Sequence, residues 1–474
     1  MLMRLNWKLI IVFILPVILW FTPAPEGLSI TAWHAFAIYL AAIVGLVLKP
    51  FPESVILLAA VGTTALLLNN PKDVLSGYAS TTTWLIFAAF ALSCSFSATG
   101  LGRRIAYILI GKLGGTSLGL GYVTAFLDMS IAPVTPSNTA RAGGIVFPII
   151  QSVAVALDSN PGETAKKIGS YLMINTYMIT KITSIMFLTG MAPNGIAIEY
   201  VHKILGISID WVFWFKGLFL PSMILMLLLP LIIYWLTKPT LKKIDHKKVS
   251  GEGLKELGPI TKREWMLIGL FLLALLGWVL PSVLQVVGIK LDIDATSVAI
   301  VIMAASFITR VITWDDMLKS KGGWSSLIWF GGIIGLSSVL SNEGFFDWLA
   351  LVMKHSLNFG NHYILALWGI TLASVVVRYL FASGSAYIAA MFPVFLIVGQ
   401  TVGIAPVALA FSLCASNGYG GALTHYTGGP APIIFGAGYN SIKSWWGVGA
   451  IVALISYLFM MVVGMIWWKA IGLF

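Results

Sequence analysis

Apolar runs long enough to cross a bilayer recur along almost the whole of this sequence. Because a transmembrane helix needs about 20 apolar residues, the runs predict about eleven spans, beginning near residues 8, 32, 54, 80, 168, 212, 265, 293, 324, 404 and 445. A chain in which 58% of the residues are hydrophobic and 10% are charged cannot bury that much apolar surface in a soluble core. The sequence therefore predicts an all-α polytopic membrane protein.

Two further apolar stretches, about 119–156 and about 361–402, are interrupted near their middle. The interruptions read APVTPSNTARAGG at 132–144 and LFASGSAYIAAMFPVF at 380–395. Backbone that breaks at membrane depth is tolerated only where it is buried in protein or lines a cavity. We therefore expect two re-entrant helical hairpins in addition to the spans.

The polar, lysine-rich segment at 238–264 divides the chain into two halves. After an extra N-terminal span within residues 1–31, we expect a first repeat at 32–237 and a second at 265–474. Each repeat has the same odd number of spans and one hairpin, so the second repeat must insert upside down. Inverted-topology repeats of this kind are the plan of many secondary transporters.

The distribution of Lys and Arg predicts the orientation. With the N-terminus in the cytoplasm, most of the 29 Lys and Arg residues, including those of the 238–264 linker, fall on the cytoplasmic side. Cytoplasmic loops carry such an excess, so we expect a multi-pass protein of the cell (inner or plasma) membrane. The same distribution explains the formal net charge of +11 without a nucleic acid partner, because the basic residues follow one membrane face.

Each hairpin is followed by a span that also breaks, at 187–199 (FLTGMAPNGIAIE) and at 421–438 (GALTHYTGGPAPIIFGAG). Interrupted segments at matching places in two inverted halves are the best sequence pointer to a transporter's binding site. The helix N-termini at such breaks carry unpaired N–H groups and partial positive charge, which favour an anion. The candidate substrate-binding residues are Ser137, Asn138, Thr139, Pro193, Asn194, Ser383, Gly384, Ser385, Thr427, Gly428 and Pro430.

Four basic side chains lie in or beside the broken elements: Arg141, Lys181, Arg378 and His425. A charge at membrane depth is costly, so each is a functional candidate, and we expect them to compensate the charge of the substrate. Alternatives are open for each one. Arg141 has Asp128 as a structural ion-pair partner, Lys181 and Arg378 are near enough to helix ends to snorkel, and His425 is also compatible with a core histidine.

The motifs at the two hairpin tips also resemble those of a known family. Ser-Asn-Thr at 137–139 and Ser-x-Ser at 383–385, in this architecture, resemble the divalent anion/sodium symporter family of di- and tricarboxylate transporters. The surrounding sequence is most similar to its exchanger branch, which includes citrate/succinate, tartrate/succinate and 2-oxoglutarate/malate antiporters. In the second motif, Gly384 replaces the Asn of sodium-coupled members and Ser385 replaces Thr. The resemblance implies a homodimer with a fixed scaffold and a mobile transport domain that moves like an elevator.

These observations predict a sodium-independent antiporter of C4 and C5 dicarboxylates such as succinate, malate, fumarate and 2-oxoglutarate, with citrate as a further candidate. A sodium-coupled symporter is the alternative. An anion channel is a more distant one, because two inverted halves closing on one site favour alternating access. The spans carry neither a nucleophile with a base nor a metal motif such as His-Glu-x-x-His. We therefore expect no enzymatic activity, metal or cofactor, and small dicarboxylate anions, the lipid bilayer and a second copy of the chain as partners.

Overall fold

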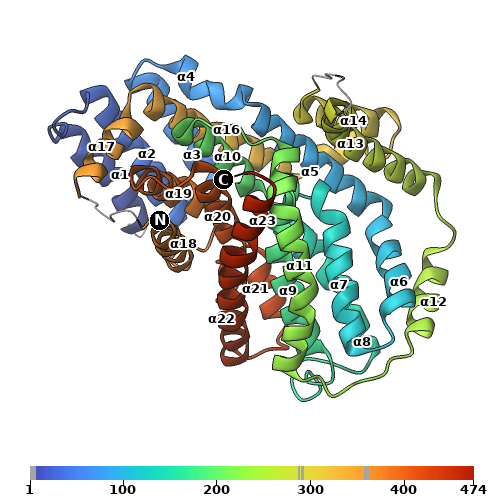
Figure 1. Ribbon diagram of the computed structural model, residues 1–474. Coiled ribbons are helices and arrows are strands. Elements are labelled where there is room, and N and C mark those ends of the chain that lie inside the picture. The colour runs from blue at the N-terminus through green and yellow to red at the C-terminus, as the bar shows by residue number, and fades with distance from the viewer. Residues whose placement is uncertain (1–6, 287–288, 290–292, 357–361, 474) are drawn as a thin grey trace, which may run out of the picture.

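The computed structural model describes residues 7–286, 289, 293–356 and 362–473, and their regular elements are helices (Figure 1). Nine helices of these residues are long and apolar enough to cross a membrane, and four apolar helices of 10–17 residues accompany them. The predicted all-α polytopic architecture is confirmed. Residues 1–6 of the predicted extra N-terminal segment, and residue 361 at the predicted start of the second hairpin, lie outside the described residues.

The helices begin close to where the apolar runs predict them, within about three residues of each expected span start. Those before the linker are α1 (Trp7–Phe21), α2 (Ile30–Leu48), α3 (Glu53–Leu67), α4 (Pro71–Ser76), α5 (Thr81–Thr99), α6 (Leu101–Leu113), α7 (Ser117–Ile131), α8 (Phe147–Ala156), α9 (Gly169–Met186), α10 (Ala192–Leu205) and α11 (Trp211–Thr237). The later ones are α12 (His246–Leu257), α13 (Lys262–Val286), α14 (Ala295–Ile308), α15 (Trp314–Leu318), α16 (Lys321–Asn342), α17 (Phe345–Ser356), α18 (Tyr363–Arg378), α19 (Gly384–Thr401), α20 (Pro406–Tyr419), α21 (Pro430–Gly436), α22 (Ile442–Phe459) and α23 (Met465–Ala470).

The first interrupted stretch forms α7, a short 3₁₀ turn at Ala132–Val134, a π-helical segment at Thr139–Val146 and then α8. Pro133 and Pro136 cannot donate a backbone hydrogen bond, so the helix ends there and residues 135–137 form a non-helical tip. A π-helical segment is wider than an α-helix and is frequent at functional sites. The chain therefore breaks where the sequence predicts it.

The second interrupted stretch forms α18 and α19, separated by residues 379–383. Ser383 is the N-cap of α19, and its Oγ accepts a hydrogen bond from the Ala386 N–H at 3.3 Å. An N-cap hydroxyl satisfies a donor that the helix cannot satisfy itself. The tip residue predicted to bind substrate is thus also the residue that starts the second arm.

The two spans that follow the hairpins are broken as well. A 3₁₀ turn at Leu188–Gly190 separates α9 from α10, which has Pro193 in its first turn. Residues 420–429 separate α20 from α21. Gly428 in this segment has a φ of 106°, a backbone conformation that residues other than Gly rarely adopt. These breaks end four helices inside the protein.

The helix contacts centre on two helices, α9 and α16. One group surrounds α9, which contacts α7, α8, α11, α20 and α21. The other surrounds α16, which contacts α2, α3, α4 and α5. The linker helix α12 packs against α6, where Ser250 Oγ donates to the Tyr107 carbonyl at 2.8 Å. Arg104 of α6 also pairs with Glu264 in the first turn of α13 at 2.6 Å.

Candidate substrate site

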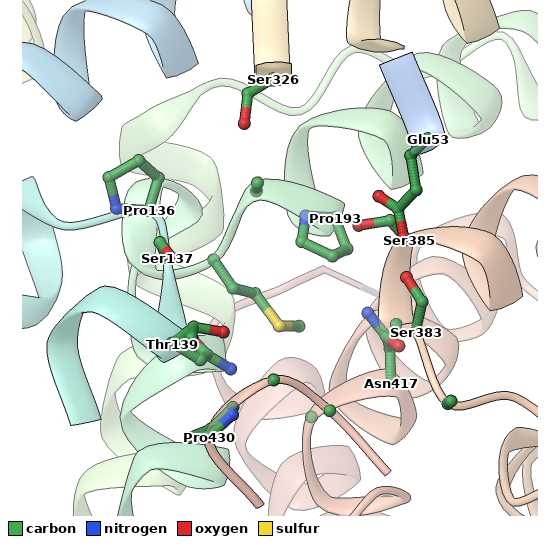
Figure 2. Close-up of a pocket in the computed structure, with 18 of the residues that line it drawn as sticks. Glu53, Pro136, Ser137, Thr139, Pro193, Ser326, Ser383, Ser385, Asn417 and Pro430 are labelled. Carbon is green, nitrogen blue, oxygen red and sulfur yellow. The ribbon is translucent and has the colours of Figure 1, made fainter. Parts of the chain in front are cut away.

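A cavity of about 430 Å³ lies where the four broken elements meet. The first hairpin contributes residues 136–139 and the second contributes 382–385, while the helix breaks contribute 191–193 and 428–430. Figure 2 shows labelled side chains from all four segments around one space. The structure thus brings together segments that are far apart in the sequence.

The opposite wall comes from helices of the group around α16. Its residues are Lys49 and Glu53 at the corner between α2 and α3, Phe90 of α5, and Ser326 and Trp329 of α16. In Figure 2, Glu53 and Ser326 lie on the far side of the space from Pro430. Sequence reasoning missed this wall. The local sequence hint of this wall is the segment KPFPE at 49–53, in which Lys49 and Glu53 flank Pro-Phe-Pro between two apolar runs.

The first tip is held by hydrogen bonds to its own hairpin and to α9. Ser137 Oγ accepts from the Ala140 N–H at 3.2 Å, and Asn138 Oδ1 accepts from Ser184 Oγ at 2.8 Å. Thr139 approaches the 428–430 loop so closely that a Cβ at Gly429 would overlap its hydroxyl. All three predicted residues, 137–139, line the cavity with partly or fully exposed side chains.

The second tip lies against a buried arginine. Arg378 donates from Nη1 to the Phe381 carbonyl at 2.7 Å and from Nε to Asn417 Oδ1 at 3.2 Å. A Cβ built at Gly384 would lie 3.1 Å from Nη2 of Arg378. Ser383, Gly384, Ser385, Arg378 and Asn417 all line the cavity. Asn417 was not predicted, because nothing in its local sequence distinguishes it from a packing residue.

A second buried cation, Lys181 of α9, supports the loop at 420–429. Its Nζ donates to the Thr427 carbonyl at 3.1 Å and lies 4.8 Å from the centroid of the Tyr177 ring. The Tyr177 hydroxyl donates to the same carbonyl at 2.6 Å. Lys181 and Arg378 both line the cavity, and neither forms an ion pair with an acid of the described residues. Such uncompensated cations favour a bound anion.

Four predicted residues do not line the cavity. Arg141 is buried and pairs with Asp128 at 3.1 Å, which is the structural alternative considered from the sequence. Asn194 is buried, and its side-chain amide donates to the Ser184 carbonyl at 2.9 Å. Thr427 is also buried, and its carbonyl accepts a hydrogen bond from Lys181. His425 accepts at Nδ1 from Trp446 Nε1 at 3.0 Å, so it packs among aromatic rings. By contrast, Pro193, Gly428 and Pro430 are part of the lining.

Comparison with known proteins decides the family. The sequence model described as "Sodium:sulfate symporter transmembrane region" matches residues 3–474. The chain is also 36% identical to the citrate/succinate antiporter of Escherichia coli K12 over 482 residues, covering 97% of each protein. The chain belongs to the divalent anion/sodium symporter family. The resemblance carried by the two tip motifs is confirmed.

Two other relatives from bacteria lie in the same range of similarity or above it. The inner membrane protein YbhI of Escherichia coli K12 is 52% identical, over 98% of this chain and 97% of that protein. The putative malate transporter YflS of Bacillus subtilis is 38% identical, over 98% and 96% respectively. The chain is therefore a multi-pass membrane protein of a transporter family.

A solved structure supports the fold independently of sequence. The efflux pump MtrF of Neisseria gonorrhoeae superposes with a TM-score of 0.60, covering 93% of this chain and 96% of that chain. The sequence identity is 15%, so this similarity concerns the arrangement of helices. The same architecture thus recurs in a membrane protein with little sequence similarity.

Proposed function

We propose that this protein exchanges C4 and C5 dicarboxylates, such as succinate, malate, fumarate and 2-oxoglutarate, across the cell membrane without sodium. The observation that carries the proposal is the cavity between the two hairpin tips, with Lys181 and Arg378 in its lining and serine hydroxyls on both tips. Two cations and two hydroxyl-bearing tips match a molecule with a carboxylate at each end. The family relatives named for citrate/succinate exchange and for malate support the same substrate class.

The position of Arg378 supports the proposed independence from sodium. Sodium-coupled members carry Asn where this chain has Gly384, and a Cβ there would approach Nη2 of Arg378 to 3.1 Å. An Asn at this position would therefore require the guanidinium to shift by a few tenths of an ångström. We infer that a fixed cation takes the place that a bound sodium ion has in relatives.

The same fixed charges support the proposed obligatory exchange. Uncompensated ions in a low-dielectric environment cost several kcal/mol each. The empty site keeps the charges of Lys181 and Arg378, whereas a bound dianion neutralises them. Crossing should therefore be fast only when the site is loaded, which produces antiport rather than net uptake.

The proposal includes an elevator motion, because the residues that line the cavity come both from the broken elements packed around α9 and from the helices packed around α16. It also includes a homodimer, a cytoplasmic N-terminus, and the repeat limits 32–237 and 265–474 on either side of the 238–264 linker. In this orientation the Lys49–Glu53 corner lies on the cytoplasmic side of the cavity.

The test uses purified protein in liposomes. Vesicles loaded with unlabelled succinate should accumulate labelled dicarboxylate equally in sodium and in potassium, and vesicles without internal carboxylate should not. Counterflow of this kind saturates, which also separates a carrier from an anion channel. Uptake into carboxylate-free vesicles that requires a sodium gradient would overturn the proposal in favour of a symporter.

A further inference from the structure

The cavity wall opposite the hairpin tips carries an ion pair that the substrate motifs do not include. Lys49 Nζ lies 3.1 Å from Glu53 Oε1, and both residues line the cavity. Their side chains are 46% and 26% exposed, so both are accessible from the cavity that they line. A carboxylate is an unexpected component of an anion site, because it repels the substrate.

The local backbone holds these two residues close together. Lys49 is the C-cap of α2 with a φ of 50° and a ψ of 54°, a left-handed conformation that Gly adopts more readily than Lys. Pro50 and Pro52 follow, and Pro52 is the N-cap of α3, in which Glu53 is the first residue. Because proline restricts φ, the corner keeps the backbones of Lys49 and Glu53 within reach of an ion pair.

The charges of the lining explain what the pair could do. The basic groups are Lys49, Lys181 and Arg378, and the acidic group is Glu53. Glu53 neutralises Lys49, which leaves the positive charges of Lys181 and Arg378. That charge is matched by a dianion, whereas a trianion leaves an excess negative charge facing Glu53.

Building on the function proposed above, we propose that Glu53 is a specificity-determining residue that selects dianionic over trianionic carboxylates. It masks Lys49 and thereby sets the net charge that the site offers to the substrate. The substrate class is thus narrowed to dicarboxylates in their doubly charged form, and citrate is disfavoured while it carries three charges.

A purely structural role is the alternative, since an acidic residue in the first turn of a helix and a pair four residues apart both stabilise helix ends. The two roles differ in what they predict for selectivity. A helix-capping pair affects the amount of folded protein equally for all substrates, whereas a charge-setting pair changes the ratio of affinities.

The size of the effect follows from Coulomb's law. A sphere with the volume of this cavity, about 430 Å³, is roughly 9 Å across. At that separation, one additional charge changes affinity by roughly twofold with the dielectric constant of water, about 80, and by roughly twentyfold with the value of about 20 found near protein surfaces; an intermediate value corresponds to about fivefold. The ratio of the inhibition constants of succinate and citrate should therefore move by about this factor for each charge changed at the corner.

The experiment measures exchange of labelled succinate in liposomes and its inhibition by succinate or citrate, at a pH where citrate is a trianion. Glu53→Gln should improve citrate relative to succinate about fivefold, and Lys49→Met should worsen it by a similar factor. The double variant should return to the wild-type ratio, and Glu53→Asp, which keeps the charge, should stay close to it.

The outcomes separate the two proposals. If the wild-type protein exchanges succinate but Glu53→Gln leaves the ratio unchanged, or both single variants move it in the same direction, the role of Glu53 is refuted while the dicarboxylate function stands. If the wild-type protein does not exchange succinate at all, both proposals fail.

Discussion

Replacing Arg141 by Met should destabilise the protein strongly, because this side chain joins three parts of the structure. Its guanidinium is fully buried and pairs with Asp128 at 3.1 Å. Nη1 donates to the Thr135 carbonyl at 2.8 Å in the first tip and to the Gly190 carbonyl at 2.7 Å in the break after α9. The residue thus holds the two non-helical segments on one side of the cavity together.

The expected magnitude follows from the buried pair. Removing one partner of such a pair costs about 3–5 kcal/mol, because the other charge stays buried without compensation. Asp128 would retain a hydrogen bond from Thr183, but its Oδ1 already has no partner. For a protein of this size we expect a thermal midpoint about 5 °C lower, since the shift per kcal/mol decreases with chain length.

The assay is thermal unfolding in detergent of Arg141→Met, Asp128→Asn and the double variant, with and without succinate. Each single variant should unfold at a lower temperature, and the double variant should be less destabilised than the sum of the two, because no uncompensated charge is left. If Arg141→Met unfolds like the wild type but no longer binds succinate, Arg141 acts on the substrate and the structural reasoning is refuted.

Three further predictions concern the cavity itself. Asn138→Ala combined with Ser383→Ala should weaken succinate binding by at least about tenfold in an equilibrium assay, since a hydrogen bond to a charged group contributes about 1.5–3 kcal/mol. An unchanged affinity would show that these two tip residues do not bind the substrate. Lys181→Met should lower affinity for dianions more than for a monocarboxylate probe, measured by competition, and an equal loss for both would contradict a charge role. Ser385→Cys should react with a polar thiol reagent and be protected by succinate, whereas Thr427→Cys, which is buried, should react slowly in both conditions.

The breaks in the helices could be predicted from sequence because their causes are local. Proline removes a backbone donor and glycine lowers helical continuity, so the positions of Pro136, Pro193 and Pro430 were enough to place non-helical backbone at membrane depth. The structure has breaks next to all three residues. The polar residues of the breaks could be nominated for the same reason.

The opposite wall of the cavity could not be predicted, because it depends on contacts between distant segments. Ser326 and Trp329 lie in an apolar run that reads as an ordinary span, and they face the site only through the packing of α16. The direction in which a charged side chain points also depends on residues that are distant in the sequence. Arg141 could point to Asp128 or to the cavity from the same position in the sequence, and the fold of the tip places it against Asp128.

The division of the cavity between two groups of helices has a consequence for the transport cycle proposed here. Lys181 and Arg378 belong to the broken elements, so they would move with the bound substrate, whereas Lys49 and Glu53 belong to the wall packed around α16 and would stay behind. The substrate would then cross neutralised by the charges that accompany it, and the corner would act only while the cavity is open. Since the corner is absent from the crossing step, Glu53→Gln should change the concentration of citrate needed for half-saturation and leave the exchange rate at saturation unchanged. A variant that altered the saturated rate and not the half-saturating concentration would place Glu53 in the moving part and contradict this division.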